Sequence, residues 1–220
     1  PLTLLWEEQH IPAILEAWFP GVQAGPALAR TLYGESNPSG KLTASFPRSV
    51  GQMPLYYNAL NTGRPSRNPS RAGDGYSSAY LDEANSALFP FGWGLSYTSF
   101  DYAPTRILTP KIRVADLNKN GTIKVESLVV NSGSRAGVET VQLYIQQRGT
   151  SVARPVRELK GFQQISLAPG ETRRVSFSLS RKELAFWNAD MKFGVEPCEL
   201  TVWIGPNSQA GQGTKIRIEP

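Results

Sequence analysis

From Gly121 onward, the sequence consists of short segments in which apolar or β-branched side chains recur at nearly every second residue. Turn signals such as Asn131-Ser132-Gly133 and Ala168-Pro169-Gly170 separate these segments. Short strands at this spacing are typical of an antiparallel β-sandwich. The segments expected to be strands are TIKVESLVV (122–130), VETVQLYIQ (138–146), ETRRVSFSLS (171–180), CELTVWIG (198–205) and TKIRIE (214–219).

Two motifs add detail to this β-rich half. The alternation in VETVQLYIQ is incomplete, so the pattern predicts a strand without settling which face points inward. The segment SRKELAFWN (180–188) predicts a short helix, with Ser180 as N-cap and with Leu184 and Trp187 facing the core.

One further motif concerns a turn. Asn120-Gly121-Thr122 fits a glycosylation sequon, yet Asn-Gly directly before a strand favours a tight hairpin turn.

The amino-terminal half has a different pattern. AILEAWFPG (13–21) indicates either a buried strand of an α/β sheet or one turn of buried helix. VQAGPALARTLYG (22–34) predicts a helix that ends at Gly34 and has an apolar face made by Ala24, Ala27, Leu28, Thr31 and Leu32. Because one strand and one helix cannot cover both faces of a sheet, residues 1 to about 50 are expected to be the tail of a larger α/β domain whose remainder precedes Pro1.

Between the halves lies FPFGWGLSYTSF (89–100), which has neither helical nor strand periodicity. Gly92 and Gly94 permit backbone conformations closed to other residues, while the aromatic rings are too apolar to be left in water. We therefore expect an ordered, packed connector. The preceding stretch TGRPSRNPSRAGDG (62–75) is the most loop-like segment, and its length favours a lid or a mobile excursion.

Charge and hydropathy exclude several classes of protein. The net charge of +5 divides into −1 for residues 1–100 and +6 for residues 101–220, where the basic residues are scattered along strands. This distribution favours a solvated β surface over a nucleic-acid interface. No apolar run approaches the roughly 20 residues of a membrane span, and the first residues contain no basic segment followed by a small-residue cleavage site, so any export signal is expected to lie outside this chain. Neither nucleic acid nor membrane is expected as a partner.

Single cysteine and histidine residues exclude other kinds of site. One cysteine, Cys198, cannot form an internal disulfide or a cysteine-based metal cluster, and it is interpreted as a small buried hydrophobic residue. His10 has no nucleophile motif nearby and is interpreted as a surface or packing residue. NPSGK lacks the spaced glycines of a phosphate loop and predicts a turn. No metal site and no cofactor is expected.

Four stretches occur in the order found in one enzyme family: residues 17–58, 60–65, 80–100 and 153–188. They include AWFPGVQAGPALARTLYGESNPSGKLTASFPRSVGQMPLYYN, LNTGRP, YLDEANSALFPFGWGLSYTSF and ARPVRELKGFQQISLAPGETRRVSFSLSRKELAFWN. Together they closely resemble the carboxy-terminal part of family 3 glycoside hydrolases, and bacterial periplasmic β-glucosidases in particular.

The resemblance implies a fold and a division into three segments. Residues 1–52 would be the carboxy-terminal end of an (α/β)6 sandwich, residues 53–100 a connecting loop and aromatic strap, and residues 101–220 an immunoglobulin/fibronectin III-like β-sandwich. The partners implied are an upstream (α/β)8 barrel and the rest of the α/β sandwich in the same enzyme. A periplasmic or secreted location is implied in the same way.

The chemistry of the family requires two carboxyl groups. Retaining hydrolysis of a β-glycoside uses a nucleophile and an acid/base roughly 5 Å apart. The resemblance implies that the nucleophilic Asp lies on the barrel and that the acid/base Glu lies earlier in the α/β sandwich than Pro1. The carboxylates of the amino-terminal half match neither motif, and no catalytic residue is assigned here; they are Glu7, Glu8, Glu16, Glu35, Asp74, Asp82 and Glu83.

Two hypotheses about function follow. In the first, the chain is the non-catalytic end of a retaining β-glucosidase that hydrolyses terminal non-reducing β-D-glucosyl residues, and it stabilises the catalytic domains. In the second, the β-sandwich is a carbohydrate- or cell-wall-binding module that tethers the enzyme. The packed connector favours the first, because a tethered module usually follows a flexible linker. Tyr56, Tyr57, Tyr76 and Tyr80 could stack on sugar, although packing within the protein is favoured.

Overall fold

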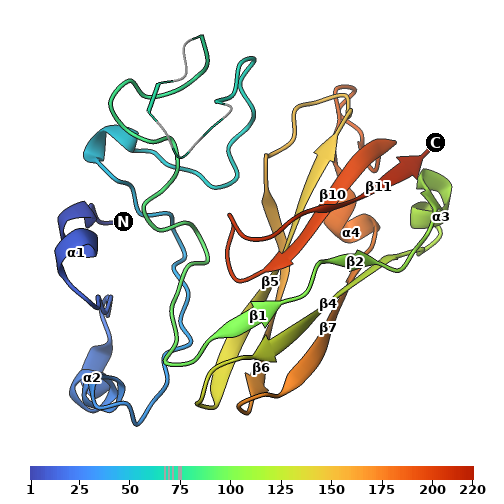
Figure 1. Ribbon diagram of the computed structural model, residues 1–220. Helices are drawn as coiled ribbons and strands as arrows, with labels where there is room; N and C mark the ends of the chain where they lie inside the picture. The colour runs from blue at the N-terminus through green and yellow to red at the C-terminus, as the bar shows by residue number, and fades with distance from the viewer. Residues whose placement is uncertain (67, 69, 71, 74–75) are drawn as a thin grey trace.

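The computed structural model describes residues 1–66, 68, 70, 72–73 and 76–220, and its dominant feature is a β-sandwich in the second half of the chain (Figure 1). The helices α1 and α2 lie to one side of it. Within the described residues the elements are α1 (Leu5–His10), α2 (Ala24–Leu32), β1 (Phe100–Tyr102), β2 (Arg106–Ile107), β3 (Ile112–Arg113), α3 (Val114–Asn118), β4 (Ile123–Asn131), β5 (Gly137–Arg148), β6 (Glu158–Leu167), β7 (Thr172–Leu179), α4 (Arg181–Leu184), β8 (Phe186–Trp187), β9 (Phe193–Gly194), β10 (Cys198–Gly205) and β11 (Thr214–Glu219), with 3₁₀ turns at Gly21–Gln23 and Val50–Gln52.

The sandwich consists of two sheets. In one sheet β4 pairs with β1 and β2 along one edge and with β7 along the other. The second sheet has the order β3-β11-β10-β5-β6. All of these pairings are antiparallel except that of β11 with β3, so the expected antiparallel sandwich is confirmed, with one parallel pair at an edge. All five segments expected to be strands form strands, and β6 is an additional one that alternation did not reveal.

The core lies between the two sheets and comes from alternate strand positions. On β4, Ile123, Val125 and Val129 are buried, and on β10, Leu200 and Val202 are buried. Removing these apolar side chains from water is the main favourable contribution to folding. Cys198 is buried at the start of β10, as expected, and burial raises the pKa of its thiol to about 11.

The incomplete alternation of β5 has a structural reason. Val141, Leu143 and Ile145 point into the sandwich core, but the intervening Gln142 and Tyr144 are buried as well. The outer face of β5 is therefore covered, not solvated. The register of its pairing with β6 also shifts between Leu143 and Tyr144, as at a β-bulge.

The predicted helix at 180–188 is shorter than expected. Ser180 caps α4 in a capping box with Glu183, and Leu184 is fully buried, as predicted. The prediction for Trp187 was wrong. Extended backbone at Ala185 ends the helix, so Trp187 belongs to β8 and is 61% exposed.

Asn120-Gly121 does not form the expected hairpin turn. These residues follow α3, and Asn120 takes a left-handed conformation (φ 68°) at its carboxy-terminal end. The Gly121 N–H donates to the Asp116 carbonyl at 2.8 Å. The Asn-Gly pair therefore terminates a helix, which requires the same positive φ as a hairpin turn.

The amino-terminal segments differ more from expectation. Residues 13–20 form neither a strand nor a helix and are largely exposed, so the predicted buried element is wrong for this structure. A strand needs a hydrogen-bonded neighbour, and no described strand pairs with this segment. Helix α2 forms and ends near Gly34, whose φ is +74°, as predicted. Of its apolar face, however, Leu28 is half-buried and Leu32 is exposed.

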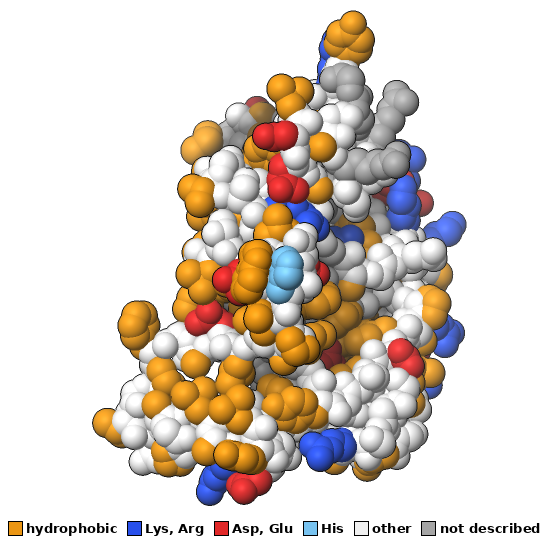
Figure 2. All heavy atoms as spheres, turned by 60° about the vertical axis from the view of Figure 1, so that its left-hand side comes forward, with side chains coloured by type: hydrophobic (Ala, Val, Ile, Leu, Met, Phe, Trp, Pro, Cys, Tyr) orange, Lys and Arg blue, Asp and Glu red, His pale blue; other side chains and the backbone are white. Residues whose placement is uncertain are grey.

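Hydrophobic side chains therefore gather on the face that carries α1 and α2 (Figure 2). Phe19 is 100% exposed and Trp18 is about half exposed. An apolar surface of this kind marks a contact surface in a soluble protein. The exposed large apolar residues of this region are Leu2, Trp6, Ile11, Ile14, Leu15, Trp18, Phe19, Val22, Leu32 and Tyr33, here called the amino-terminal apolar face.

Candidate functional site

The strap, residues 89–100, runs beside an earlier segment of the chain. The Leu42 N–H donates to the Trp93 carbonyl at 2.7 Å, and the Gly92 N–H donates to the Leu42 carbonyl at 2.8 Å. Farther along, the Phe46 N–H donates to the Phe89 carbonyl at 2.8 Å. These backbone bonds fix one side of the strap to the amino-terminal part of the chain.

Aromatic side chains of the strap contact both the amino-terminal part of the chain and the β-sandwich. Phe89 contacts Phe46 and Trp93, with ring centroids 6.5 and 6.1 Å away. Phe91 stacks on Tyr57 at 4.1 Å and 13° between planes, and Tyr57 meets the edge of Tyr144 at 6.1 Å. Because Tyr144 lies on β5, the Phe91 stack connects the strap to the sandwich. The expected packed connector is confirmed.

Gln142 on β5 is the main polar contact between strap and sandwich. Its Nε2 donates to the Gly92 carbonyl at 3.1 Å and to the Pro206 carbonyl at 2.6 Å. The Tyr144 hydroxyl donates to its Oε1. A Cβ on Gly92 would collide with that oxygen, and the φ of Gly92 is +80°. Glycine is therefore required here on two independent grounds.

A second polar contact is charged. Lys41 Nζ lies 3.2 Å from Glu139 Oε2 and donates to the Gly94 carbonyl at 3.1 Å. Glu139, on β5, is only 3% exposed and also accepts from the Tyr102 hydroxyl at 2.7 Å. Burial, with the Glu139 carboxylate beside it, raises the pKa of the Tyr102 hydroxyl, so this group remains a donor. A buried carboxylate needs such partners, since desolvation is costly for an unpaired charge.

Asn37 makes a third contact, at the other end of the strap. Its Nδ2 donates to the Ala136 carbonyl at 3.0 Å, and its Oδ1 accepts from the Tyr97 N–H at 2.8 Å. The Tyr97 hydroxyl donates to the Thr31 carbonyl at the end of α2. One amide thus connects the amino-terminal part, the strap and the β4–β5 loop.

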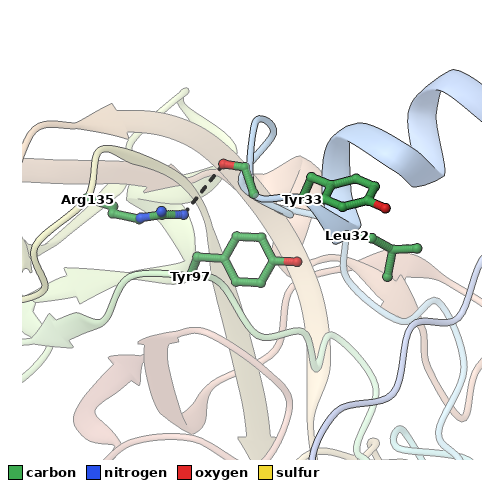
Figure 3. A pocket seen from close by; sticks show the side chains of 5 residues that line it. Leu32, Tyr33, Tyr97 and Arg135 are labelled. Atoms are coloured by element: carbon green, nitrogen blue, oxygen red, sulfur yellow. Dashed lines mark hydrogen bonds between the residues drawn. The ribbon is translucent and has the colours of Figure 1, made fainter.

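A hollow of about 320 Å³ lies next to this contact, lined by Leu32, Tyr33, Gly34, Tyr97 and Arg135. Figure 3 shows the Arg135 guanidinium reaching toward the Gly34 carbonyl, at 3.5 Å, with the Tyr97 ring beside it. Leu32, Tyr33 and Arg135 are exposed to solvent. The hollow is therefore open, and it forms part of the junction between α2 and the sandwich.

The carboxylates of the first half are not brought together. Glu16 accepts from the Trp18 N–H and Glu83 from the Ala84 N–H, and both contacts are local. Glu8 and Asp82 are exposed. Within the described part of the chain no hydrogen bond joins two of these groups, and Asp74 lies outside it. Glu7 lies on α1, and Glu35 is an exposed residue after α2.

Of the other candidates, His10 donates from Nδ1 to the Trp6 carbonyl at 2.7 Å, and its ring stacks on the Trp6 ring at 4.7 Å. Tyr57 packs in the strap stack, while Tyr56 and Tyr76 are exposed and Tyr80 is partly exposed. Among the described residues no three His, Cys, Asp or Glu side chains gather closely enough to hold a metal ion. The loop 62–75 contains five positions outside the described residues, so its predicted role as a lid has no test here.

Sequence reasoning missed the polar contacts of the junction, which are made by Asn37, Lys41, Glu139 and Gln142. Lys41 directly follows Asn37-Pro38-Ser39-Gly40, which was predicted to be a turn but forms no turn in the structure, and it carries no signal of burial. On β5, Glu139 stands at a position where alternation calls for an apolar side chain, and it is buried, whereas Gln142 fits the alternation and gave no signal.

Comparison with known proteins shows that both sides of this junction match domains of one enzyme family. Residues 1–97 match the model of the glycosyl hydrolase family 3 C-terminal domain, and residues 139–208 match that of the fibronectin type III-like domain. A periplasmic beta-glucosidase of Salmonella typhimurium is 47% identical over 208 residues, covering 94% of this chain and 26% of the relative. A beta-xylosidase of Formosa agariphila is 42% identical over 96% of this chain and 27% of the relative.

A solved structure agrees. The crystal structure of a beta-glucosidase from Listeria innocua superposes with a TM-score of 0.90 at 37% identity, covering 100% of this chain and 29% of that one. The chain thus spans little more than a quarter of the length of these relatives. Within the described residues, no helix has the length and apolar character needed to cross a membrane.

Proposed function

The chain belongs to glycoside hydrolase family 3, whose carboxy-terminal region it matches, and from this premise we propose that it is the non-catalytic end of a retaining β-glucosidase-type enzyme. The enzyme would hydrolyse terminal non-reducing β-D-glucosyl residues. The chain's own role is to hold the β-sandwich rigidly against the α/β part and so to stabilise the catalytic domains. The observation that carries this proposal is the strap, which is bonded to both sides by backbone and buried side-chain contacts.

The chemistry supports a non-catalytic role. Retaining hydrolysis needs two carboxyl groups about 5–5.5 Å apart, one to attack the anomeric carbon and one to protonate the leaving oxygen. Glu139 is the buried carboxylate of the junction, but its oxygens are already bonded to Lys41 and Tyr102. It therefore stabilises an interface. The nucleophile and the acid/base are proposed to lie in the upstream barrel and in the preceding part of the α/β sandwich.

The amino-terminal apolar face supplies the contact surface for these partners. Fully exposed Phe19 and nearly fully exposed Val22 would be buried by the remaining strands and helices of an α/β sandwich. The proposed segments are residues 1–52 for the end of that sandwich, 53–100 for the connecting loop and strap, and 101–220 for the fibronectin III-like sandwich. The start of β1 at Phe100 supports the last boundary. A periplasmic or secreted location is proposed from the similarity to the Salmonella relative.

The alternative, a carbohydrate-binding module on a tether, requires the sandwich to move independently of the α/β part. The buried Lys41 to Glu139 pair and the Gln142 contacts oppose such movement.

The test is turnover of an aryl β-glucoside. The 220-residue chain should give no hydrolysis above background, whereas a polypeptide that also carries the upstream domains should be active. Activity of the 220-residue chain that disappears on mutating one of its own Asp or Glu residues would refute the proposal.

A further inference from the structure

A small hairpin after α4 carries two exposed aromatic rings. Strands β8 and β9 pair antiparallel, with Trp187 opposite Phe193. The two ring centroids are 5.5 Å apart, with 52° between planes. Trp187 is 61% exposed and Phe193 is 47% exposed, whereas the neighbouring Phe186 is buried on the inner side. The two rings thus form an aromatic platform on the outer side of the hairpin.

The platform is held in place by its surroundings. Arg181, the first residue of α4 (labelled in Figure 1), donates to the Phe193 carbonyl at 3.0 Å and lies 5.6 Å from the Phe193 ring. The Asn188 side chain accepts from the Asp190 and Lys192 N–H groups at 3.0 and 2.9 Å, which closes the turn. The rings are therefore positioned before any ligand arrives, and little ordering entropy remains to be lost on binding.

Polar groups with spare bonding capacity surround the rings. Asp190 and Lys192 are exposed, and within the described residues their side chains make no hydrogen bond or ion pair. The Arg181 guanidinium uses one N–H on the Phe193 carbonyl and has further donors free of the protein. Each of the two rings offers a flat apolar face, inclined at 52° to the other, with donors and acceptors at the edge. A single ring face of this kind matches a pyranose, whose C–H face is apolar and whose rim carries hydroxyls.

The size and the edge of the platform argue against a protein partner. A stable protein interface buries roughly 800 Å² on each side and is depleted in charge at its centre. This platform consists of two rings next to a turn that carries exposed Met191, Asp190 and Lys192, and the charged Arg181 contacts the Phe193 ring. Such a surface suits one or two sugar residues better than a folded domain or a second copy of the chain.

We propose that Trp187 and Phe193 form a binding subsite for pyranose residues of a β-linked glucan. The choice of β-linked glucose as the ligand rests on the proposed function, while the platform itself rests on the geometry of the hairpin. The contacts of the strap go to β5 and to the Pro206–Ser208 turn, so the hairpin is free of that junction. A sugar bound here would therefore leave the strap unchanged.

The test uses isothermal titration of the 220-residue chain with cellohexaose and laminarihexaose, and with maltohexaose as an α-linked comparison. Binding to at least one β-linked hexasaccharide is expected. Trp187→Ala and Phe193→Ala should each weaken it at least about tenfold, and Trp187→Phe only a few-fold, since a smaller ring face remains. Trp6→Ala is the matched control, because Trp6 is also 61% exposed and lies on the amino-terminal apolar face.

Circular dichroism and thermal midpoints show whether each variant is folded. If the alanine variants do not fold, the binding of Trp187→Phe still tests the proposal. The proposal is overturned if neither β-linked hexasaccharide binds, if maltohexaose binds equally well, or if Trp6→Ala has the same effect as Trp187→Ala. It is also overturned if Trp187→Ala instead abolishes self-association of the chain, which would make the platform a protein contact. The binding test does not depend on turnover. The subsite proposal can therefore fail while the proposed function stands, and the proposed function can fail while the subsite proposal stands.

Discussion

Gln142 and Gly92 are 50 residues apart in the chain, yet the Gln142 side chain donates to the Gly92 carbonyl at 3.1 Å and occupies the space where a Cβ of residue 92 would lie. The strap can therefore seat on the sandwich only with glycine at this position. The same amide also holds the Pro206 carbonyl, so a single side chain fixes the strap and the turn after β10.

Gly92→Ala should destabilise the chain by about 2–4 kcal/mol, because it adds a clash with Gln142 to the strain of a positive φ. Urea unfolding measures the change. Gly149→Ala is the matched control, since the φ of Gly149 is +83° but a Cβ added there would meet no atom within 4 Å. It should cost about 1 kcal/mol. Equal losses for the two variants would mean that backbone strain alone accounts for the effect.

Lys41→Met or Glu139→Gln alone should lower the free energy of unfolding by about 3–5 kcal/mol, because the remaining polar or charged partner stays buried without its ion pair. The double variant Lys41→Met/Glu139→Gln should be less destabilised than the sum of the single variants. The exposed pair of Lys215 and Glu199, 2.9 Å apart, is the control, and Lys215→Met should cost at most about 1 kcal/mol. Strict additivity in the double-mutant cycle would argue that the buried pair is not coupled.

Trp93→Ala should loosen the strap more than it unfolds the sandwich. The Trp93 ring contacts Phe89, which in turn contacts Phe46, and it is half-buried. The loss of stability should therefore be below the roughly 3–5 kcal/mol expected for removing a fully buried aromatic side chain. Hydrogen exchange should rise across residues 41–46 and 89–93, while β5 and β7 keep their protection. Loss of protection in those strands would place Trp93 in the sandwich core.

Phe91→Ala should instead lower the protection of β5, because Phe91 contacts that strand through Tyr57.

Limited proteolysis should cut residues 1–50 first and leave a fragment of about 101–220 intact. The sandwich has a complete core, whereas the amino-terminal part exposes its apolar residues. Mass spectrometry of the fragments provides the measurement. A protected amino-terminal fragment beside a digested carboxy-terminal half would contradict this expectation.

Cys198 should be unreactive toward a thiol reagent at pH 8 until the chain unfolds. Burial raises the pKa of its thiol to about 11 from an ordinary 9, so the folded state holds this proton more tightly than the unfolded state. The resulting contribution to stability is fully present below pH 9 and is lost as the pH rises toward 11. The stability of Cys198→Val should fall less over that range than that of the wild type. Identical pH profiles would mean that the thiol does not titrate differently on folding.

The sandwich was predictable because its strands are amphipathic and its turns have distinctive residues. Val125, Leu200 and Val202 are buried for the reason that the pattern indicated: a two-residue period with one face on the core. Strand β6 escaped the pattern, since its sequence ELKGFQQISL alternates poorly and its early residues are half-buried. Trp187 was misplaced because helical spacing was extended past Leu184, where extended backbone at Ala185 had already ended the helix.

The junction was much less predictable. The spacing of aromatic residues in the strap indicated packing, but Lys41, Glu139 and Gln142 are ordinary polar residues whose burial depends on contacts between distant segments. A break in the alternation, as at Glu139, can show that a position is unusual, but local sequence does not show which distant segment contacts it. The prediction of a buried element at residues 13–20 was wrong for a related reason, because its apolar side chains need neighbours that the described chain does not provide.

The bridge between Phe46 and Phe89 brings together the two ends of a long excursion, residues 47–88. Closure at this neck means that the length of the excursion can change at little cost in closure free energy, since that cost rises only slowly with loop length, provided that Tyr57 still stacks on Phe91 and the Ala59 carbonyl still accepts from the Val156 N–H. An exchange of the excursion between homologous enzymes therefore preserves the junction only if the donor segment keeps the contacts of Tyr57 and Ala59.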